Sequence, residues 1–267
     1  MLASISFTGC QLSRARIIYR RIQMEQLASQ MKLLTCRISR QALNFEKISD
    51  WNCMMDNNKI YALYGVWMKL FGFERSISSF VEKLEISCSN EADILDVGCG
   101  TGVVGLSLAK NIPKSKLLLT DLNSSLLIQA ISNAQKAGIF NARITTGISD
   151  ISMPRKIKLA DDSEICLQEN KFDVVSVGAA IGYSKDQENT IIELLSLVKK
   201  GGYFLNIEMN DGYIGSLVSS RYKYPIIPIH KMQRIITSQG FSLIDVPLSI
   251  NYFPANFTRK CMLAKKL

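Results

Sequence analysis

Two carboxylates and a run of glycines are the residues of this sequence whose types and spacing could do chemistry. Gly98, Gly100 and Gly102 follow a short apolar segment that contains Asp96, and Asp121 ends the next apolar segment. Glycines are needed where a chain turns sharply and a ligand lies against the backbone, because a Cβ would collide there. A carboxylate in the position of Asp121 can accept both hydroxyl protons of a ribose. The pattern therefore predicts a site for a ligand that contains a nucleoside.

The sign of the charge in this loop separates two kinds of nucleoside ligand. Gly105 completes a G-x-G-x-x-G pattern that also occurs in dinucleotide-binding loops. Asp96, two residues before the first glycine, would repel a pyrophosphate, and the glycine run already starts at Gly98. The charge suits a ligand with an ammonium group and hydroxyl donors, such as S-adenosylmethionine. Asp121 serves either ligand, and it could instead cap a helix that starts near Ser124.

The elements that must position these residues alternate between strand and helix from residue 92 onward. The alternation predicts a mostly parallel sheet covered by helices on both faces. The last two strands have no helix between them, which predicts an antiparallel edge. Residues 151–171 read as a polar excursion with turns at Asp161-Asp162 and Glu169-Asn170. Strands are expected at Ile94–Val97, Leu117–Thr120, Ala142–Thr146, Phe172–Val177, Tyr203–Ile207, 242–253 and 259–265, and helices at Val103–Lys110, Ser124–Lys136, Gln187–Lys199 and His230–Ser238.

Four segments in this order resemble the successive motifs of class I S-adenosylmethionine-dependent methyltransferases. They are Asp96-Val-Gly98-Cys-Gly100-Thr-Gly102, Asp121, Phe172-Asp-Val-Val and Leu197-Val-Lys-Lys-Gly201-Gly202. The resemblance covers roughly residues 75–265 and includes the small-molecule branch of that class. It implies an α/β, Rossmann-like sheet of seven mostly parallel strands in the order 3-2-1-4-5-7-6, with strand 7 antiparallel. Separately, the helical spacing of Ile77, Phe80, Val81 and Leu84 predicts an N-terminal helical cap.

The resemblance also implies the residues that hold the cofactor, S-adenosyl-L-methionine. Ile148 and Ser149 would make backbone contacts, whereas Asp150 is either the partner of the adenine amine or a turn aspartate. Cys99 lies inside the loop without an implied nucleophilic role. The implied cofactor-binding residues are Asp96, Gly98, Cys99, Gly100, Thr101, Gly102, Asp121, Leu122, Ile148, Ser149 and Gly178.

The methyl acceptor is expected at the carboxyl ends of the fourth and fifth strands, beneath the cap. The candidate catalytic residues there are Tyr183, Glu208 and His230. Each tyrosine could instead be a packing residue, and a single histidine could instead be a capping or surface residue. Further residues expected around the same mouth are Asn210, Tyr213 and Tyr222, together with Tyr61, Tyr64 and Trp67 of the apolar segment 60–73.

The motifs that this sequence lacks bear on the acceptor class. The position after the fourth strand reads Gly178-Ala-Ala-Ile-Gly-Tyr183, without the proline pair of enzymes that methylate base amines, and no Pro-Cys dipeptide occurs. Of the net charge of +9, residues 1–40 contribute +6, so the remainder is close to balanced. We therefore predict a methyltransferase that acts on a small-molecule acceptor. An RNA or protein methyltransferase and an inactive cofactor-binding partner protein are the alternatives.

The chain is predicted to comprise a basic leader (1–40), a helical cap (41–90) and the methyltransferase domain (91–267). The leader is nearly free of acids and resembles a transit peptide, but Met24 or Met31 could instead be the true start, or the segment could be an ordinary basic helix. The predicted location is accordingly cytoplasmic, or mitochondrial if the leader is a transit peptide. Seven cysteines without a C-x-x-C pair and a single histidine favour a reducing compartment and exclude a Cys/His zinc site, so no metal is expected. No transmembrane run is present, and nothing in the pattern indicates an oligomeric state.

Overall fold

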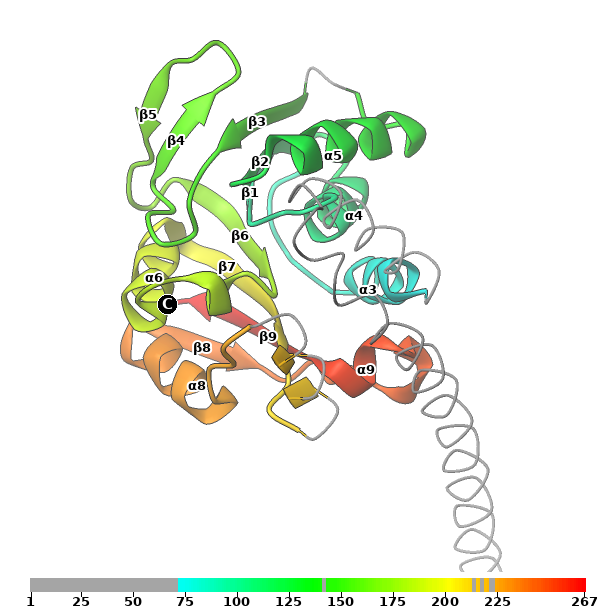
Figure 1. The fold of residues 1–267 in the computed structure, drawn as a ribbon, viewed down its shortest axis with the longest axis vertical. Helices are drawn as coiled ribbons and strands as arrows, with labels where there is room; N and C mark the ends of the chain where they lie inside the picture. Colours follow the sequence, from blue (N-terminus) through cyan, green and yellow to red (C-terminus); the bar gives the residue numbers. More distant parts are fainter. Residues whose placement is uncertain (1–71, 141–142, 213–214, 217–218, 221–223) are drawn as a thin grey trace, which may run out of the picture. The chain divides into compact units, whose positions relative to one another are not determined.

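The computed structural model of this protein describes residues 72–140, 143–212, 215–216, 219–220 and 224–267 (Figure 1). The chain divides into two units, Met1–Lys59 and Ile60–Leu267, and every described residue belongs to the second. The predicted leader and most of the predicted cap therefore lie outside the described residues. The same is true of five predicted mouth residues, Tyr61, Tyr64, Trp67, Tyr213 and Tyr222.

A single sheet runs through the described part of the chain, in the order β5-β4-β3-β2-β1-β6-β7-β9-β8. The strands β3, β2, β1, β6 and β7 are parallel neighbours, whereas β9 is antiparallel to both β7 and β8. The carboxyl ends of the parallel strands therefore meet at one edge, where open α/β sheets bind ligands. The strands are β1 (Asp93–Val97), β2 (Lys116–Asp121), β3 (Ile144–Ile148), β4 (Lys156–Leu159), β5 (Glu164–Cys166), β6 (Phe172–Gly178), β7 (Val198–Met209), β8 (Phe241–Ile244) and β9 (Arg259–Lys266).

The predicted fold class is confirmed, but the prediction of seven strands is wrong. The segment read as a polar excursion forms the antiparallel hairpin β4–β5, which extends the sheet beyond β3. The turns predicted within this segment exist, because Asp162 and Asn170 both have positive φ angles. When the hairpin is set aside, the other strands lie in the order β3-β2-β1-β6-β7-β9-β8, which is the relative order that the resemblance implies.

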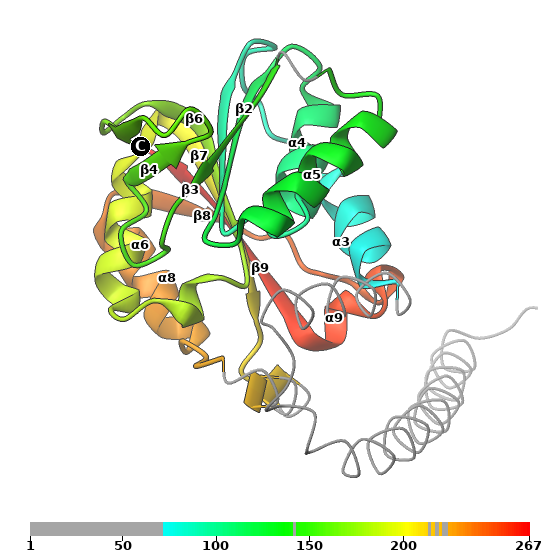
Figure 2. The same ribbon diagram turned by 45° about the horizontal axis from the view of Figure 1, so that its top comes forward.

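Helices cover both faces of the sheet, as Figures 1 and 2 show. Side chains alternate along each strand, so neighbours such as Ile94 and Leu95 enter two separate cores. The first core lies under α3 (Phe73–Val81), α4 (Val103–Asn111) and α5 (Ser124–Lys136), and the second lies under α6 (Gln187–Ser196) and α8 (Ile229–Ser238). Shorter elements complete the described chain: η3 (Ile181–Tyr183), η4 (Ile250–Tyr252) and α9 (Ala255–Thr258). None of the described helices is long and apolar enough to cross a membrane.

Two predicted element boundaries are corrected by backbone geometry. The fourth predicted strand is followed by α6, which ends at Ser196 rather than continuing to Lys199, and β7 starts at Val198. Gly201 and Gly202 therefore lie within β7, where a Cβ on Gly202 would come 2.8 Å from the Asp173 carbonyl oxygen. The strand predicted over 242–253 ends at Ile244, and the chain then passes through η4 and α9 before β9.

Candidate functional site

The glycine loop between β1 and α4 has the sharp turn that its sequence predicts. Gly98, Gly100 and Gly102 all have positive φ angles, of 60°, 54° and 84°. A Cβ on Gly98 would collide with the Cβ of Ala180, which follows β6. A Cβ on Gly100 would meet no atom within 4 Å, so the space beside Gly100 is open. The loop is therefore packed against the segment that follows β6 on one side, and it has open space at Gly100.

Asp96 lies beneath this loop and is almost completely buried, with 1% of its surface exposed. One carboxylate oxygen accepts the Gly105 N–H of α4 (2.9 Å), and the other accepts the Ser176 hydroxyl of β6 (2.7 Å). A Cβ on Gly105 would come 2.8 Å from Asp96, so glycine is needed for this close approach of helix and strand. Burial raises the pKa of Asp96 to about 7, although the two hydrogen bonds oppose the shift. The contacts of Asp96 within the chain are thus with α4 and β6, and a contact with the ammonium group of a ligand stays a prediction.

Asp121 ties the glycine loop to the end of β2. Its carboxylate oxygens accept the N–H groups of Gly100 (2.8 Å) and Asn123 (2.9 Å). The alternative that Asp121 caps α5 is wrong, because the Asn123 side chain accepts the Ser125 N–H at that helix start. Burial raises the pKa of Asp121, and the N–H donors oppose this shift. Each carboxylate oxygen can accept a further hydrogen bond, so Asp121 could also take ribose hydroxyls.

The ends of β2 and β3 form a rim that carries two exposed apolar side chains. Leu122 and Ile148 are 67% and 40% exposed, and the Ser149 N–H joins the two strand ends by donating to the Asp121 carbonyl oxygen (3.1 Å). The Ser149 hydroxyl is buried without a hydrogen-bond partner. Asp150 accepts the Ser152 N–H (2.8 Å), which is the turn-aspartate arrangement.

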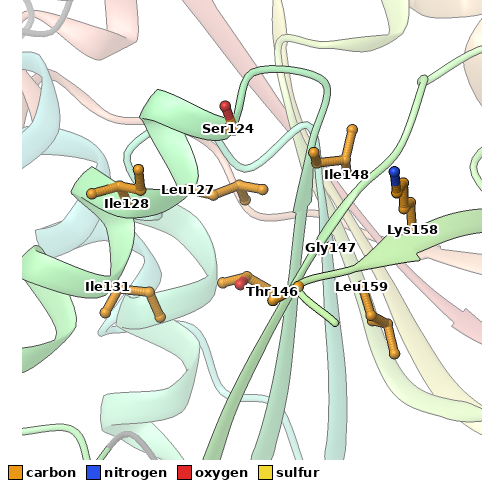
Figure 3. Close-up of a pocket in the computed structure, with 10 residues that line it drawn as sticks. Ser124, Leu127, Ile128, Ile131, Thr146, Gly147, Ile148, Lys158 and Leu159 are labelled. Atoms are coloured by element: carbon orange, nitrogen blue, oxygen red, sulfur yellow. The ribbon is translucent and has the colours of Figure 1, made fainter. Parts of the chain in front are cut away.

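An apolar groove of about 200 Å³ adjoins this rim between α5, β3 and β4 (Figure 3). Leu127, Ile128 and Ile131 line it from the helix, while Ile148 and Leu159 line it from the strands. The hairpin β4–β5 thus builds one wall of a groove that begins at a predicted cofactor-binding residue, Ile148.

Two more loop residues have defined partners. Burial and the neighbouring carboxylates Asp96 and Asp121 raise the pKa of the Cys99 thiol well above its usual range, which opposes a nucleophilic role. The Thr101 hydroxyl donates to Glu74 of α3 (3.1 Å). Sequence reasoning missed Glu74, because the contact joins segments that no motif links.

On the acceptor side, two of the three predicted catalytic residues are brought together by a residue that the sequence did not single out. Gly178 ends β6, and Tyr183 follows in η3 with 59% of its surface exposed. The Tyr183 ring packs edge-on against the Tyr224 ring, with centroids 4.9 Å apart. The Tyr224 hydroxyl donates to Glu208 at the end of β7 and accepts the Gly182 N–H (2.8 Å).

The third predicted catalytic residue is not part of this group. His230 is an exposed residue in the first turn of α8, a helix that packs against α6 and β8. The structure therefore matches the surface alternative for His230. Asn210 does follow β7 at the predicted mouth, but its side chain is engaged there, since it donates to the Phe257 carbonyl oxygen (2.8 Å). No group of His, Cys, Asp and Glu residues in the described part of the chain could hold a metal ion.

The sheet topology and the glycine loop define a class I S-adenosylmethionine-dependent methyltransferase. The chain belongs to the family of methyltransferase domains, whose model matches residues 89–236, more than half of its length. It is 23% identical over 248 residues to a demethylmenaquinone methyltransferase of Leptospira interrogans, covering 91% of this chain and 88% of the relative. It is 24% identical to a ubiquinone/menaquinone biosynthesis C-methyltransferase of Idiomarina loihiensis, covering 76% and 77%. An O-methyltransferase family protein from Burkholderia thailandensis shares the fold, with a TM-score of 0.60, 14% identity and coverage of 79% of this chain and 60% of that chain.

The cofactor is S-adenosylmethionine, and the geometry of the loop suits it. The backbone beside Gly100 is open, and Asp121 lies next to that opening with both oxygens able to accept further hydroxyls. The buried hydroxyls of Thr120 and Ser149 lack partners at the same edge of the sheet. Buried polar atoms without partners are rare in folded proteins, and a polar ligand or ordered water commonly satisfies them.

Proposed function

We propose that this protein transfers the methyl group of S-adenosylmethionine to a ring carbon of a small, largely apolar acceptor of the quinol type. The observation that carries this proposal is the similarity to a demethylmenaquinone methyltransferase, which extends over 91% of this chain. A quinol ring is electron-rich next to its hydroxyl groups, so a ring carbon can attack a methyl group. Residues 41–267 carry a charge close to balanced, and they lack the proline pair of enzymes that methylate base amines. Both features agree with a small apolar acceptor better than with a polyanion.

We assign the cofactor contacts from the geometry of the loop. The backbone of Gly98, Gly100 and Gly102 would lie against the methionine part of the cofactor, with Cys99 and Thr101 between them. Asp121 would accept the ribose hydroxyls, and Leu122 and Ile148 would cover the two sides of the adenine. Ser149 and Gly178 would complete the rim. Asp96 would act indirectly, because its hydrogen bonds to Gly105 and Ser176 fix the shape of the loop.

Methyl transfer requires the protein mainly to position the acceptor and to exclude water from the site. The bound cofactor supplies a methyl group on a positively charged sulfur, which is already activated for displacement. The loops after β6 and β7 would hold the acceptor carbon in line with that methyl group, and such alignment can supply much of the rate enhancement. A ring carbon that gains a methyl group must then lose a proton, so the site also needs a group that accepts it.

Replacing Asp121 by alanine is expected to weaken S-adenosylmethionine binding by about 1–3 kcal/mol, because the ribose hydroxyls lose their buried acceptor. This corresponds to a dissociation constant roughly 5 to 150 times larger. Isothermal titration calorimetry of the full-length protein measures the change. The control is Asp161→Ala, since Asp161 is exposed in the β4–β5 turn, where it accepts the Ser163 N–H, and its replacement should leave the affinity unchanged. Equal affinities for wild type and Asp121→Ala would show that Asp121 does not bind the ribose of the cofactor.

The acceptor class is tested by incubating the full-length protein with labelled S-adenosylmethionine and chemically reduced demethylmenaquinone. We expect label in a product with one added ring methyl, identified by mass spectrometry. The control acceptor is reduced menaquinone, whose corresponding ring carbon already carries a methyl group and should stay unlabelled. Cofactor binding without transfer to the demethylated quinol, together with transfer to another metabolite, would overturn the quinol assignment and leave the methyltransferase itself in place.

A further inference from the structure

Several buried polar atoms without hydrogen-bond partners lie outside the cofactor edge, in residues at the end of β7 and around the start of β9. Two of the seven in the described residues, Thr120 and Ser149, lie at the cofactor edge. The other five lie where β7 ends and β9 begins, because Met209 pairs with Arg259 and the Asn210 N–H donates to the Thr258 carbonyl oxygen (2.9 Å). They are Asn206 Oδ1, Glu208 Oε2, Asn256 Oδ1, Thr258 Oγ1 and an Arg259 guanidinium nitrogen. Such atoms are rare in folded proteins, and each is a point where a polar ligand or ordered water can bind.

Glu208 is the acid in this cluster, and it is held by one oxygen only. Its side chain has 0% of its surface exposed. Oε1 accepts the Tyr224 hydroxyl and the Met209 N–H (2.9 Å), whereas Oε2 has no partner. A carboxylate fixed in this way presents one free acceptor oxygen in a place shielded from solvent.

A continuous chain of contacts leads from the cofactor loop to Glu208. The space for a Cβ at Gly98 is filled by Ala180, and the space for a Cβ at Gly182 is filled by the Tyr224 ring. The Gly182 N–H donates to the Tyr224 hydroxyl, which in turn donates to Glu208. The loop after β6 is thus fixed at one end to the cofactor loop and at the other to the Glu208 pair.

Building on the function proposed above, we propose that Glu208 accepts the proton that the acceptor loses on methylation, with Tyr224 as a positioning residue. The acceptor carbon forms a bond to the methyl carbon while the sulfur–methyl bond breaks, and that electron pair stays on sulfur in S-adenosylhomocysteine. The methylated ring carbon then releases its proton to Glu208 Oε2, and the C–H electron pair restores the aromatic ring. Glu208 gives up this proton, which returns to solvent before the next turnover.

The charged and polar surroundings of Glu208 set the expected pH dependence. Burial raises the pKa of Glu208, while the Tyr224 hydrogen bond, the Met209 N–H, the charge of Arg259 and the Asn206 side chain lower it. Lys260 pairs with Glu208 in the β7–β9 register but is exposed. Because a base must be ionised to accept a proton, kcat should rise with pH through the Glu208 pKa. Losing the Tyr224 hydrogen bond would move that rise to higher pH.

The test compares Glu208→Gln, Tyr224→Phe and the control Asp211→Asn, an exposed acid just beyond β7. With reduced demethylmenaquinone and labelled cofactor, Glu208→Gln should lower kcat by roughly 10²–10⁴-fold and abolish its rise with pH. Tyr224→Phe should retain turnover with the rise displaced to higher pH, and Glu208→Asp should restore part of the rate. Calorimetry should give unchanged S-adenosylmethionine affinity for all variants, and Asp211→Asn should match wild type throughout.

The failures of this inference and of the proposed function are distinguishable. Wild-type protein that binds S-adenosylmethionine but methylates no quinol refutes the quinol acceptor. In that case the same variants are compared on whichever metabolite fraction takes up label. A Glu208→Gln variant with wild-type kcat and an unchanged pH profile refutes the role of Glu208. If Glu208→Gln does not fold, the pH profile of Tyr224→Phe decides, because a purely structural role would lower activity equally at every pH.

Discussion

Valine in place of Gly100 is expected to abolish S-adenosylmethionine binding without unfolding the protein. The Gly100 backbone has a φ of 54° beside open space, so the side chain would enter the volume assigned to the cofactor. A β-branched residue at positive φ also strains the backbone, by about 1–2 kcal/mol or more. Isothermal titration calorimetry should show no heat of cofactor binding, while circular dichroism should show the wild-type content of helix and strand.

The matched control for Gly100→Val is Gly138→Val. Gly138 also has a positive φ, of 73°, and an added Cβ there would likewise meet no atom within 4 Å. It follows α5 at the opposite edge of the sheet from the glycine loop, so its replacement causes the same kind of backbone strain far from the cofactor. We expect similar losses of melting temperature in both variants and wild-type cofactor affinity in Gly138→Val. Loss of binding in both variants would mean that strain, and not the volume of the cofactor, is responsible.

The second large effect is a decrease of stability with rising pH, caused by Asp96. Burial raises its pKa to about 7 from the value of 3.8 that applies to an exposed aspartate. Between these values the folded protein keeps a proton that the unfolded chain has released. The contribution of Asp96 is therefore fully present below about pH 4 and is lost as pH rises to about 7. At about 1.4 kcal/mol per pH unit, the free energy of unfolding should fall by about 3 kcal/mol between about pH 5 and about pH 8.

Asp96→Asn separates this contribution from those of other buried acids. Burial also raises the pKa values of Asp121 and Glu208, so they contribute with the same sign. An asparagine at position 96 resembles the protonated acid and cannot ionise, so the variant should lose most of the Asp96 share of the pH dependence. Urea unfolding of both proteins at about pH 5 and about pH 8 gives the comparison. Parallel curves for wild type and Asp96→Asn would show that Asp96 is ionised at the same pH in the folded and unfolded chains.

The parts of this fold that the sequence could predict are those where residue type and backbone geometry are tightly coupled. Positive φ angles favour glycine, so Gly98, Gly100 and Gly102 mark the loop directly. The hairpin β4–β5 was missed because its strands are only four and three residues long and place single apolar residues among charged ones, a pattern that also suits a loop. The end of α6 was misplaced because Gly201 and Gly202 suggested a helix end, whereas they lie within a strand.

Residues of the candidate site could be predicted only where they lie together in one segment of the sequence. Asp96 and Asp121 were found from their places within and at the end of apolar segments, but their partners Ser176 and Gly100 became known only from the fold. Tyr224 was missed because its hydrogen bond to Glu208 joins a loop to a strand end, and neither residue has a motif of its own. His230 was proposed from residue type alone. Its exposed position on α8 shows that residue type without an identified neighbouring residue is a weak basis for predicting a catalytic role.

The most direct test of this account is the destination of the methyl group. Full-length protein and labelled S-adenosylmethionine are incubated with the metabolite, the RNA or the protein fraction of a cell extract, in three separate reactions. We predict label in organic-soluble small molecules of the quinol type, at a rate that depends weakly on salt, and no label with Gly100→Val. Label found only in RNA, and falling steeply between low and physiological salt, would contradict it, because such salt dependence is typical of a polyanionic acceptor.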